Sequence, residues 1–290
     1  MKKSLLLTIS HDQAALDAVR FASSFFADKS RAEITLLYIA PNPKQNLDYD
    51  SSPGEKVTDT ERLSAAYRKK GYASLHRAAE MLISSGFDPD AVKTSLVFRS
   101  VSTAADIAGQ ANKGMYDAVL LGRRGLSLLE ELVEESVSRK LLDQDIQCPL
   151  WLCRKPEADR RDVLLCTDGS AESLRIADHV GFMLENEPGH RIRILNVQDG
   201  PRDKSGSYIE ETRQELANNN IPGERIDSLV IPGKSPSKII LEHALENKYA
   251  VIGMGRRGRG NTGLSRLFMG STTQNILKSL EKISLWVCRD

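Results

Sequence analysis

Three glycine-containing turns in the second half of the sequence have the residue types best suited to holding an anion. They are Asp168-Gly169-Ser170, Pro232-Gly233-Lys234-Ser235-Pro236, and the long stretch from Gly255 to Gly270-Ser271-Thr272. Glycine lets backbone N–H groups approach phosphate oxygens closely, and hydroxyl side chains at a helix start add donors. The long stretch contains no acidic residue and four arginines, Arg256, Arg257, Arg259 and Arg266. Its local charge therefore suits a polyphosphate.

An internal repeat places these turns in the second of two similar halves. Tyr116 to Leu126 is echoed by Tyr249 to Gly258, and Pro149 to Arg154 is echoed by Ser284 to Arg289. A chain of 290 residues is long enough for about two domains. We therefore expect domains at 1–154 and 162–290. The charged, proline-containing segment 155–161 is the expected linker.

Each half alternates β-branched runs with amphipathic helical stretches, which predicts an α/β fold with a doubly wound, five-stranded parallel sheet. In the second half we expect strands at 163–167, 191–197, 226–231, 250–253 and 285–288. The expected helices are 170–184, 205–219, 236–247 and 271–280, with Ser170 and Ser271 as N-caps. The first half runs in the same order, with about 25 extra residues in its middle; the polar stretch 41–60 is the expected place, and we expect a mobile loop around 42–54. Met1 to Asp12 is interpreted as the first buried strand rather than a secretory signal.

In sheets of this kind, ligands bind beyond the carboxyl ends of the strands where the strand order reverses. The glycine pattern there resembles the universal stress protein family, and the resemblance covers the chain twice. ATP-binding members carry Gly, two residues, Gly, nine residues, then Gly-Ser/Thr. Here Gly255-Arg256-Arg257-Gly258 precedes Gly270-Ser271 by eleven residues, with Asn261-Thr262 as the insertion. The family's Val-Asp-Gly-Ser corresponds to Thr167-Asp168-Gly169-Ser170.

The resemblance implies an adenine nucleotide alpha hydrolase-like fold that binds ATP, ADP or AMP in the second half. Adenine would lie near Asp168 and the Val197 backbone, and magnesium could reach the Asp168 carboxylate. The implied nucleotide-binding residues are Thr167, Asp168, Val197, Gly233, Met254, Gly255, Arg256, Gly258, Gly270, Ser271 and Thr272. We expect a stress-response sensor or regulator that binds nucleotide rather than an enzyme.

The first half lacks several of these residues, so we expect it to be free of nucleotide. Asp168 aligns with Ser10, Gly233 with Ser100, and Gly270-Ser271 with Glu135-Ser136. Like charge in this loop would repel a triphosphate, because it contains Glu130, Glu131, Glu134 and Glu135. This half would then act as a structural or regulatory partner.

Related family members pair their last strands across a two-fold axis. Leu150 to Cys153 and Leu285 to Cys288 would pair within this one chain, giving an intramolecular pseudo-dimer. Trp151 and Trp286 would pack at that junction. The pseudo-dimer could associate further into a homodimer.

Three other functions remain as alternatives. A slow ATPase is the enzymatic one, although no nucleophile and general-base pair is apparent. A scaffold without a ligand follows if the glycines serve only as turns. Gly253 to Gly258 also spells a dinucleotide motif, but it follows a late strand and lacks the acidic residue expected about 20 positions on.

The amino-acid composition argues against nucleic-acid-binding, membrane-spanning and disulfide-bonded proteins. The 40 Lys and Arg balance 39 Asp and Glu, which gives a formal charge of +1 and no global field for nucleic acid or an anionic membrane. No apolar run is long enough for a membrane span. The cysteines show no metal or disulfide spacing, so we expect reduced thiols in a cytoplasmic protein. His76, His179, His190 and His243 are expected on solvated helix faces.

Overall fold

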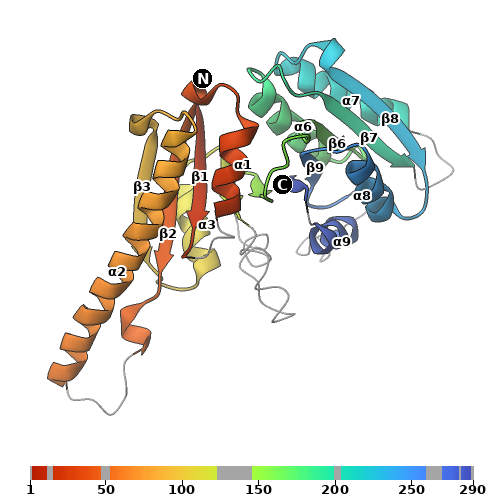
Figure 1. The fold of residues 1–290 in the computed structure, drawn as a ribbon. Coiled ribbons are helices and arrows are strands. Elements are labelled where there is room, and N and C mark those ends of the chain that lie inside the picture. Colours follow the sequence, from red (N-terminus) through yellow and green to blue (C-terminus); the bar gives the residue numbers. More distant parts are fainter. Residues whose placement is uncertain are drawn as a thin grey trace.

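A single sheet runs through both halves of the described chain (Figure 1). The computed structural model describes residues 2–11, 16–46, 53–122, 146–198, 204–258, 270–280 and 282–288. The first-half strands are β1 Lys3–Ile9, β2 Ala32–Ala40, β3 Val92–Phe98, β4 Ala118–Leu121 and β5 Leu150–Leu152. The second-half strands are β6 Val163–Cys166, β7 Ile192–Gln198, β8 Ile226–Pro232, β9 Val251–Gly255 and β10 Ser284–Cys288.

The strand order is β3-β2-β1-β4-β5-β10-β9-β6-β7-β8. Neighbouring strands within each half are parallel, and β5 pairs with β10 antiparallel. The expected doubly wound parallel domains and the expected pairing of the last strands are therefore confirmed. The first predicted strand is also confirmed, since β1 lies between β2 and β4 and its leucines are buried.

Helices cover both faces of the sheet and divide the core into two layers. One buried cluster contains side chains of α1 Asp17–Phe25, α2 Pro53–Ser84, α6 Ala171–Leu184 and α7 Ser205–Asn218. The other contains side chains of α3 Thr103–Gly114, α8 Pro236–Glu246 and α9 Ser271–Ser279. The alternating burial of strand side chains feeds both clusters, as a sheet buried on both faces requires.

The two halves meet at the tryptophan pair expected there. Trp151 of β5 lies opposite Trp286 of β10, with ring centroids 3.7 Å apart and planes inclined by 6°. Both rings are fully buried, and Phe25 of α1 packs edge-on against each. The Trp151 indole N–H donates to His179 Nε2 across the junction at 2.9 Å. Aromatic packing and buried hydrogen bonds such as this one thus fix how the halves meet.

The histidine prediction is wrong at two of its four positions. His179 and His190 are both buried. His179 accepts the Trp151 hydrogen bond, and His190 stacks on Phe25 of the other half. His179 on a helix face and His190 in a loop are covered when the two halves pair. The local sequence around each histidine gives no sign of this contact. His76 is exposed, as expected.

The described part of the extra first-half residues is helical rather than a loop. Residues 43–46 form a short 3-10 turn, and 53–60 already belong to α2, a helix of 32 residues. Residues 47–52 lie outside the described part. Proline at the first position of a helix is compatible with its start, so Pro53 begins α2 rather than interrupting a loop.

One capping prediction is confirmed and the other is wrong. The Ser170 side chain caps α6 by accepting from the Ser173 backbone N–H at 3.2 Å. Gly270, not Ser271, is the N-cap of α9. Ser271 instead lies in the first turn of that helix.

The described helices include none that is long and apolar enough to cross a membrane. Cys148, Cys153, Cys166 and Cys288 are all free thiols.

His179 makes stability depend on pH. Burial, with a smaller effect of Lys3, lowers its pKa to about 3, whereas the unfolded side chain titrates near 6.5. Between these values the unfolded chain binds the extra proton, so the free energy of unfolding falls as pH falls from about 6.5. We expect His179→Gln, whose amide oxygen can still accept from Trp151, to remove about 2 kcal/mol of the loss between pH 7.5 and 5.0. Urea unfolding at both pH values measures this.

The matched control is His76→Gln, which removes an exposed histidine from α2. It should leave the pH dependence of wild type. Equal slopes for His179→Gln and wild type would contradict the assigned role of His179.

A candidate nucleotide cleft at the carboxyl ends of the second-half strands

The second half contains a cleft of about 630 Å³ at the carboxyl ends of β6, β7 and β9. Strand β6 has β7 on one side and β9 on the other, so the strand order reverses at the cleft. This is where open α/β sheets hold ligands. The first turn of α9 and the start of α7 complete the walls.

Nine of the eleven residues predicted to bind nucleotide line this cleft. They are Thr167, Asp168, Val197, Met254, Gly255, Gly258, Gly270, Ser271 and Thr272. Gly233 and Arg256 do not line it. The Gly233 N–H donates to the Gln198 carbonyl, and a Cβ at this glycine would lie 2.3 Å from Ile239. Gly233 therefore shapes the turn after β8 rather than the cleft wall.

Asp168 both caps a turn and faces the cleft. Its Oδ1 accepts from the Ser170 N–H at 3.0 Å, which is the turn-forming role. Its other oxygen points across to the glycine loop, because a Cβ built on Gly258 would lie 2.7 Å from Asp168 Oδ2. A side chain at 258 would displace this carboxylate from its present position, so the absence of a Cβ at Gly258 matches the two sides of the cleft in shape.

A buried polar network that the sequence analysis missed forms the floor. Asn196 in β7 donates its side-chain N–H to the Thr167 carbonyl at 2.7 Å, and its Oδ1 accepts from Ser205 Oγ at 2.7 Å. Thr212 Oγ1 donates to Thr167 Oγ1 at 2.9 Å. These bonds tie α7 to β6 and β7. Asn196 between the apolar Leu195 and Val197 was the signal available in the sequence.

The positive charge expected from the glycine loop is largely compensated within the described residues. Arg257 pairs with Glu172 of α6 at 3.6 Å, and both side chains are more than 90% buried. The Arg257 backbone N–H also donates to Glu172. Arg256 is 1% exposed and lies outside the cleft lining. Arg259 and Arg266 lie outside the described residues. Glu172 comes from a helix 85 residues earlier, so the composition of the glycine loop gave no sign of this pair.

Other features of the cleft favour an anion. Gly270 caps α9 with extended backbone and no side-chain bond, and Ser271 and Thr272 of its first turn line the cleft. The first N–H groups of a helix have no acceptor within the helix and carry partial positive charge. Lys204 also lines the cleft. The helix end is held in place by Thr273 Oγ1, which donates to the Gly255 carbonyl at 3.2 Å.

The cleft offers few groups for covalent chemistry. Cys166 lies in its wall, but burial and nearby Asp168 raise the pKa of its thiol to about 12, so it stays protonated at neutral pH. Among the residues that the structure describes, no group of three His, Cys, Asp or Glu side chains could hold a metal ion. The arrangement suits binding of a phosphorylated ligand.

The first half is built differently at the turn after β3. Ser100 occupies the position of Gly233, and its N–H donates to Asp106 Oδ2 at 2.8 Å. Its hydroxyl also donates to Asp106, and the position of Asp106 corresponds to Ile239 in the second half. A carboxylate therefore occupies the turn amides of the first half. The acidic loop of the first half comes after β4. Its residues Glu130, Glu131, Glu134, Glu135 and Ser136 lie outside the described residues.

Comparisons with known proteins give one family and one fold. The family model described as the universal stress protein family matches residues 1–154 and 159–289. The structure is similar to a universal stress protein from Archaeoglobus fulgidus DSM 4304, with a TM-score of 0.71 and 19% identity over 99% of this chain and 96% of that chain.

A protein from Pseudomonas aeruginosa UCBPP-PA14 assigned to the same family gives a TM-score of 0.58 and 18% identity, over 99% of this chain and 93% of that one. A functionally unknown protein from Pseudomonas aeruginosa PAO1 gives 0.56 and 16%, over 99% and 92%. No curated protein sequence gives a significant match. At these identities the structural likeness shows the fold.

Gly169 should be required for the cleft wall. It has φ of +70°, and a Cβ there would lie 2.2 Å from the Tyr208 ring. We expect Gly169→Ala to lower the free energy of unfolding by about 1 to 2 kcal/mol.

Gly206→Ala is the control, because Gly206 lies in α7 with no atom near the position of its missing Cβ. Alanine favours a helix over glycine by about 0.5 to 1 kcal/mol, so this variant should not lower the free energy of unfolding. Denaturant unfolding of both variants measures the difference, and equal effects would contradict the role of Gly169.

Proposed function

Because the chain belongs to the universal stress protein family, we propose that it binds one adenine nucleotide in the cleft of its second half. The observation that carries the proposal is the meeting of nine sequence-predicted residues around one cavity at the point of strand reversal. The volume of about 630 Å³ lies in the usual range of small-molecule sites, roughly 300 to 1,000 Å³.

The two ends of the cleft differ in polarity, which orients the ligand. Leu195, Val197, Ile240 and Met254 supply an apolar end suited to the adenine ring. Gly258, Gly270 and the first turn of α9 supply backbone N–H groups and hydroxyls at the other end, suited to phosphates. Asp168 lies at the glycine loop and can accept from ribose hydroxyls or hold a magnesium ion on the phosphates.

The first half would act as a structural partner that responds to the occupied cleft. It is joined to the second half through β5, β10 and the buried tryptophan pair. Helix α6 contacts both the cleft, through Glu172 and Arg257, and the junction, through His179. The protein would thereby work as an ATP-, ADP- or AMP-dependent sensor or regulator in the cytoplasmic stress response.

Calorimetric titration of magnesium-ATP, AMP and NAD tests the proposal. We expect ATP or AMP to bind at about one per chain and NAD to bind more weakly, because the cleft is built for one nucleotide. Gly270→Glu places a carboxylate at the α9 N-terminus and should weaken ATP binding at least about tenfold. AMP, with fewer phosphate charges, should lose less.

Gly270→Ala separates charge from shape. Its Cβ would lie 3.3 Å from Arg257 Cα, a tight contact that a small shift can relieve. It should retain most of the ATP affinity that Gly270→Glu loses. The proposal is overturned if neither adenine nucleotide binds, or if both variants bind ATP as wild type does.

A further inference from the structure

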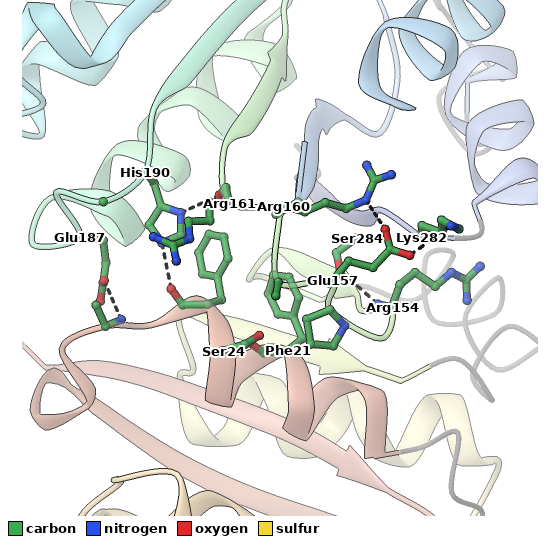
Figure 2. Close-up of a pocket in the computed structure, with 16 residues that line it drawn as sticks. Phe21, Ser24, Arg154, Glu157, Arg160, Arg161, Glu187, His190, Lys282 and Ser284 are labelled. Carbon is green, nitrogen blue, oxygen red and sulfur yellow. Dashed lines mark hydrogen bonds and ion pairs between the residues drawn. The ribbon is translucent and has the colours of Figure 1, made fainter. Parts of the chain in front are cut away.

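A second cavity, of about 490 Å³, lies at the opposite end of the second-half strands from the nucleotide cleft (Figure 2). Its lining includes residues just before or at the start of four strands, Arg161 before β6, His190 before β7, Ala250 before β9 and Ser284 at the start of β10. It shares no lining residue with the cleft. The same cavity is lined by α1 of the first half and by the segment 156–161.

The interior of this cavity is aromatic. Phe21 and Phe25 of α1 are 2% and 4% exposed and stack with centroids 4.9 Å apart. The His190 ring stacks on Phe25 at 4.3 Å, and its two nitrogens lie 2.6 and 2.9 Å from the carbonyl oxygens of Arg161 and Phe25. These contacts fix the inner surface as a rigid, apolar face.

The mouth of the cavity is basic. Lys282 and Arg161 line the cavity and are exposed, with 55% exposure for the Lys282 side chain. The lining contains four basic side chains and two carboxylates. In a chain whose formal charge is +1, this is a local concentration of positive charge.

Both carboxylates of the lining are already engaged. Glu157 lies between Arg160 Nε at 2.7 Å and Lys282 Nζ at 3.2 Å, as Figure 2 shows. Glu187 accepts from the Ala27 N–H at 2.8 Å, which holds the end of α1 to the second half. The Glu157 ion pairs weaken both the repulsion by this carboxylate and the attraction by Lys282, and the four basic and two acidic side chains leave the lining with a net charge of +2.

We propose that this interdomain cavity binds a small organic carboxylate, with its apolar body directed toward the end lined by Phe21 and Phe25 and its charge at Arg161 and Lys282. The gradient from buried aromatic rings to exposed cations orients such a ligand. Since the ligand touches α1, the connecting segment and the second half together, its binding stabilises their packing.

Calorimetry with 4-phenylbutyrate as the probe tests the proposal on the full chain. We expect 4-phenylbutyrate to bind and to raise the thermal midpoint. The alcohol 4-phenylbutan-1-ol has the same body without the charge, and acetate has the charge without the body. Both should bind at least about tenfold more weakly. Equal binding of the alcohol would overturn the role of the cations, and no binding of 4-phenylbutyrate would overturn the site.

Substitutions at the mouth of the cavity test whether each charged side chain strengthens or weakens binding of 4-phenylbutyrate. Arg161→Gln with Lys282→Gln should weaken 4-phenylbutyrate about tenfold, as expected for two partly solvated ion pairs. Glu157→Gln should tighten it, because it removes the carboxylate that Arg160 and Lys282 share. Lys155→Gln is the matched control, since Lys155 is exposed in the same segment and does not line the cavity. It should bind as wild type does.

Competition separates this site from the nucleotide cleft. Saturating AMP should leave 4-phenylbutyrate affinity unchanged, and Gly270→Glu should bind the probe normally. Displacement by AMP, or equal loss of affinity in Lys155→Gln and the double variant, would overturn the proposal.

Discussion

The antiparallel pairing of β5 with β10 is the constraint on which the rest of the structure depends. Strand β5 has only three residues, and alone it would leave an apolar sheet edge in water. Each half covers the other's edge, and the stacked Trp151 and Trp286 bury the joint completely. Helices α1 and α6 pack on this joint through Phe25 and His179. Because α6 also supplies Glu172 to the glycine loop, the junction and the nucleotide cleft share one rigid element.

Much of this arrangement could be predicted from the sequence because the chain repeats itself. The repeat aligns Trp151 with Trp286 and identifies both last strands, and glycine with hydroxyl residues at strand ends indicates the cleft. The other outcomes depend on contacts between distant segments. His179 and His190 are buried by the opposite half, and Glu172 reaches Arg257 from a helix 85 residues earlier. The polarity and proline content of 41–60 predicted a loop where α2 begins. That prediction failed because helix α2 is stabilised partly by its packing on β2 and β3, which local composition does not reveal.

The sequence indicated that arginine side chains would supply the positive charge of the cleft, whereas in the structure other groups do so. Four arginines in one loop suggested an open basic site, but Arg257 is paired with Glu172 and Arg256 does not line the cavity. The proposed preference for an anion thus rests on the start of α9, which has no side-chain cap, on Lys204 and on glycines that permit close approach. In the first half, Asp106 fills the corresponding turn after β3, where the second half has Ile239. A few substitutions on one scaffold therefore distinguish the half proposed to bind nucleotide from the half proposed to support it.

Hydrogen-deuterium exchange of the full chain with and without magnesium-ATP tests this division most directly. The account predicts that nucleotide slows exchange at 167–170, 254–258 and 270–273, at the ends of β6 and β9 and the start of α9. The first-half strand ends at 9–11 and 121–122, which correspond to 167–169 and 254–255, should exchange at unchanged rates. Protection in the first half, or no protection in either half, would contradict the central claim that one cleft of this paired fold binds nucleotide.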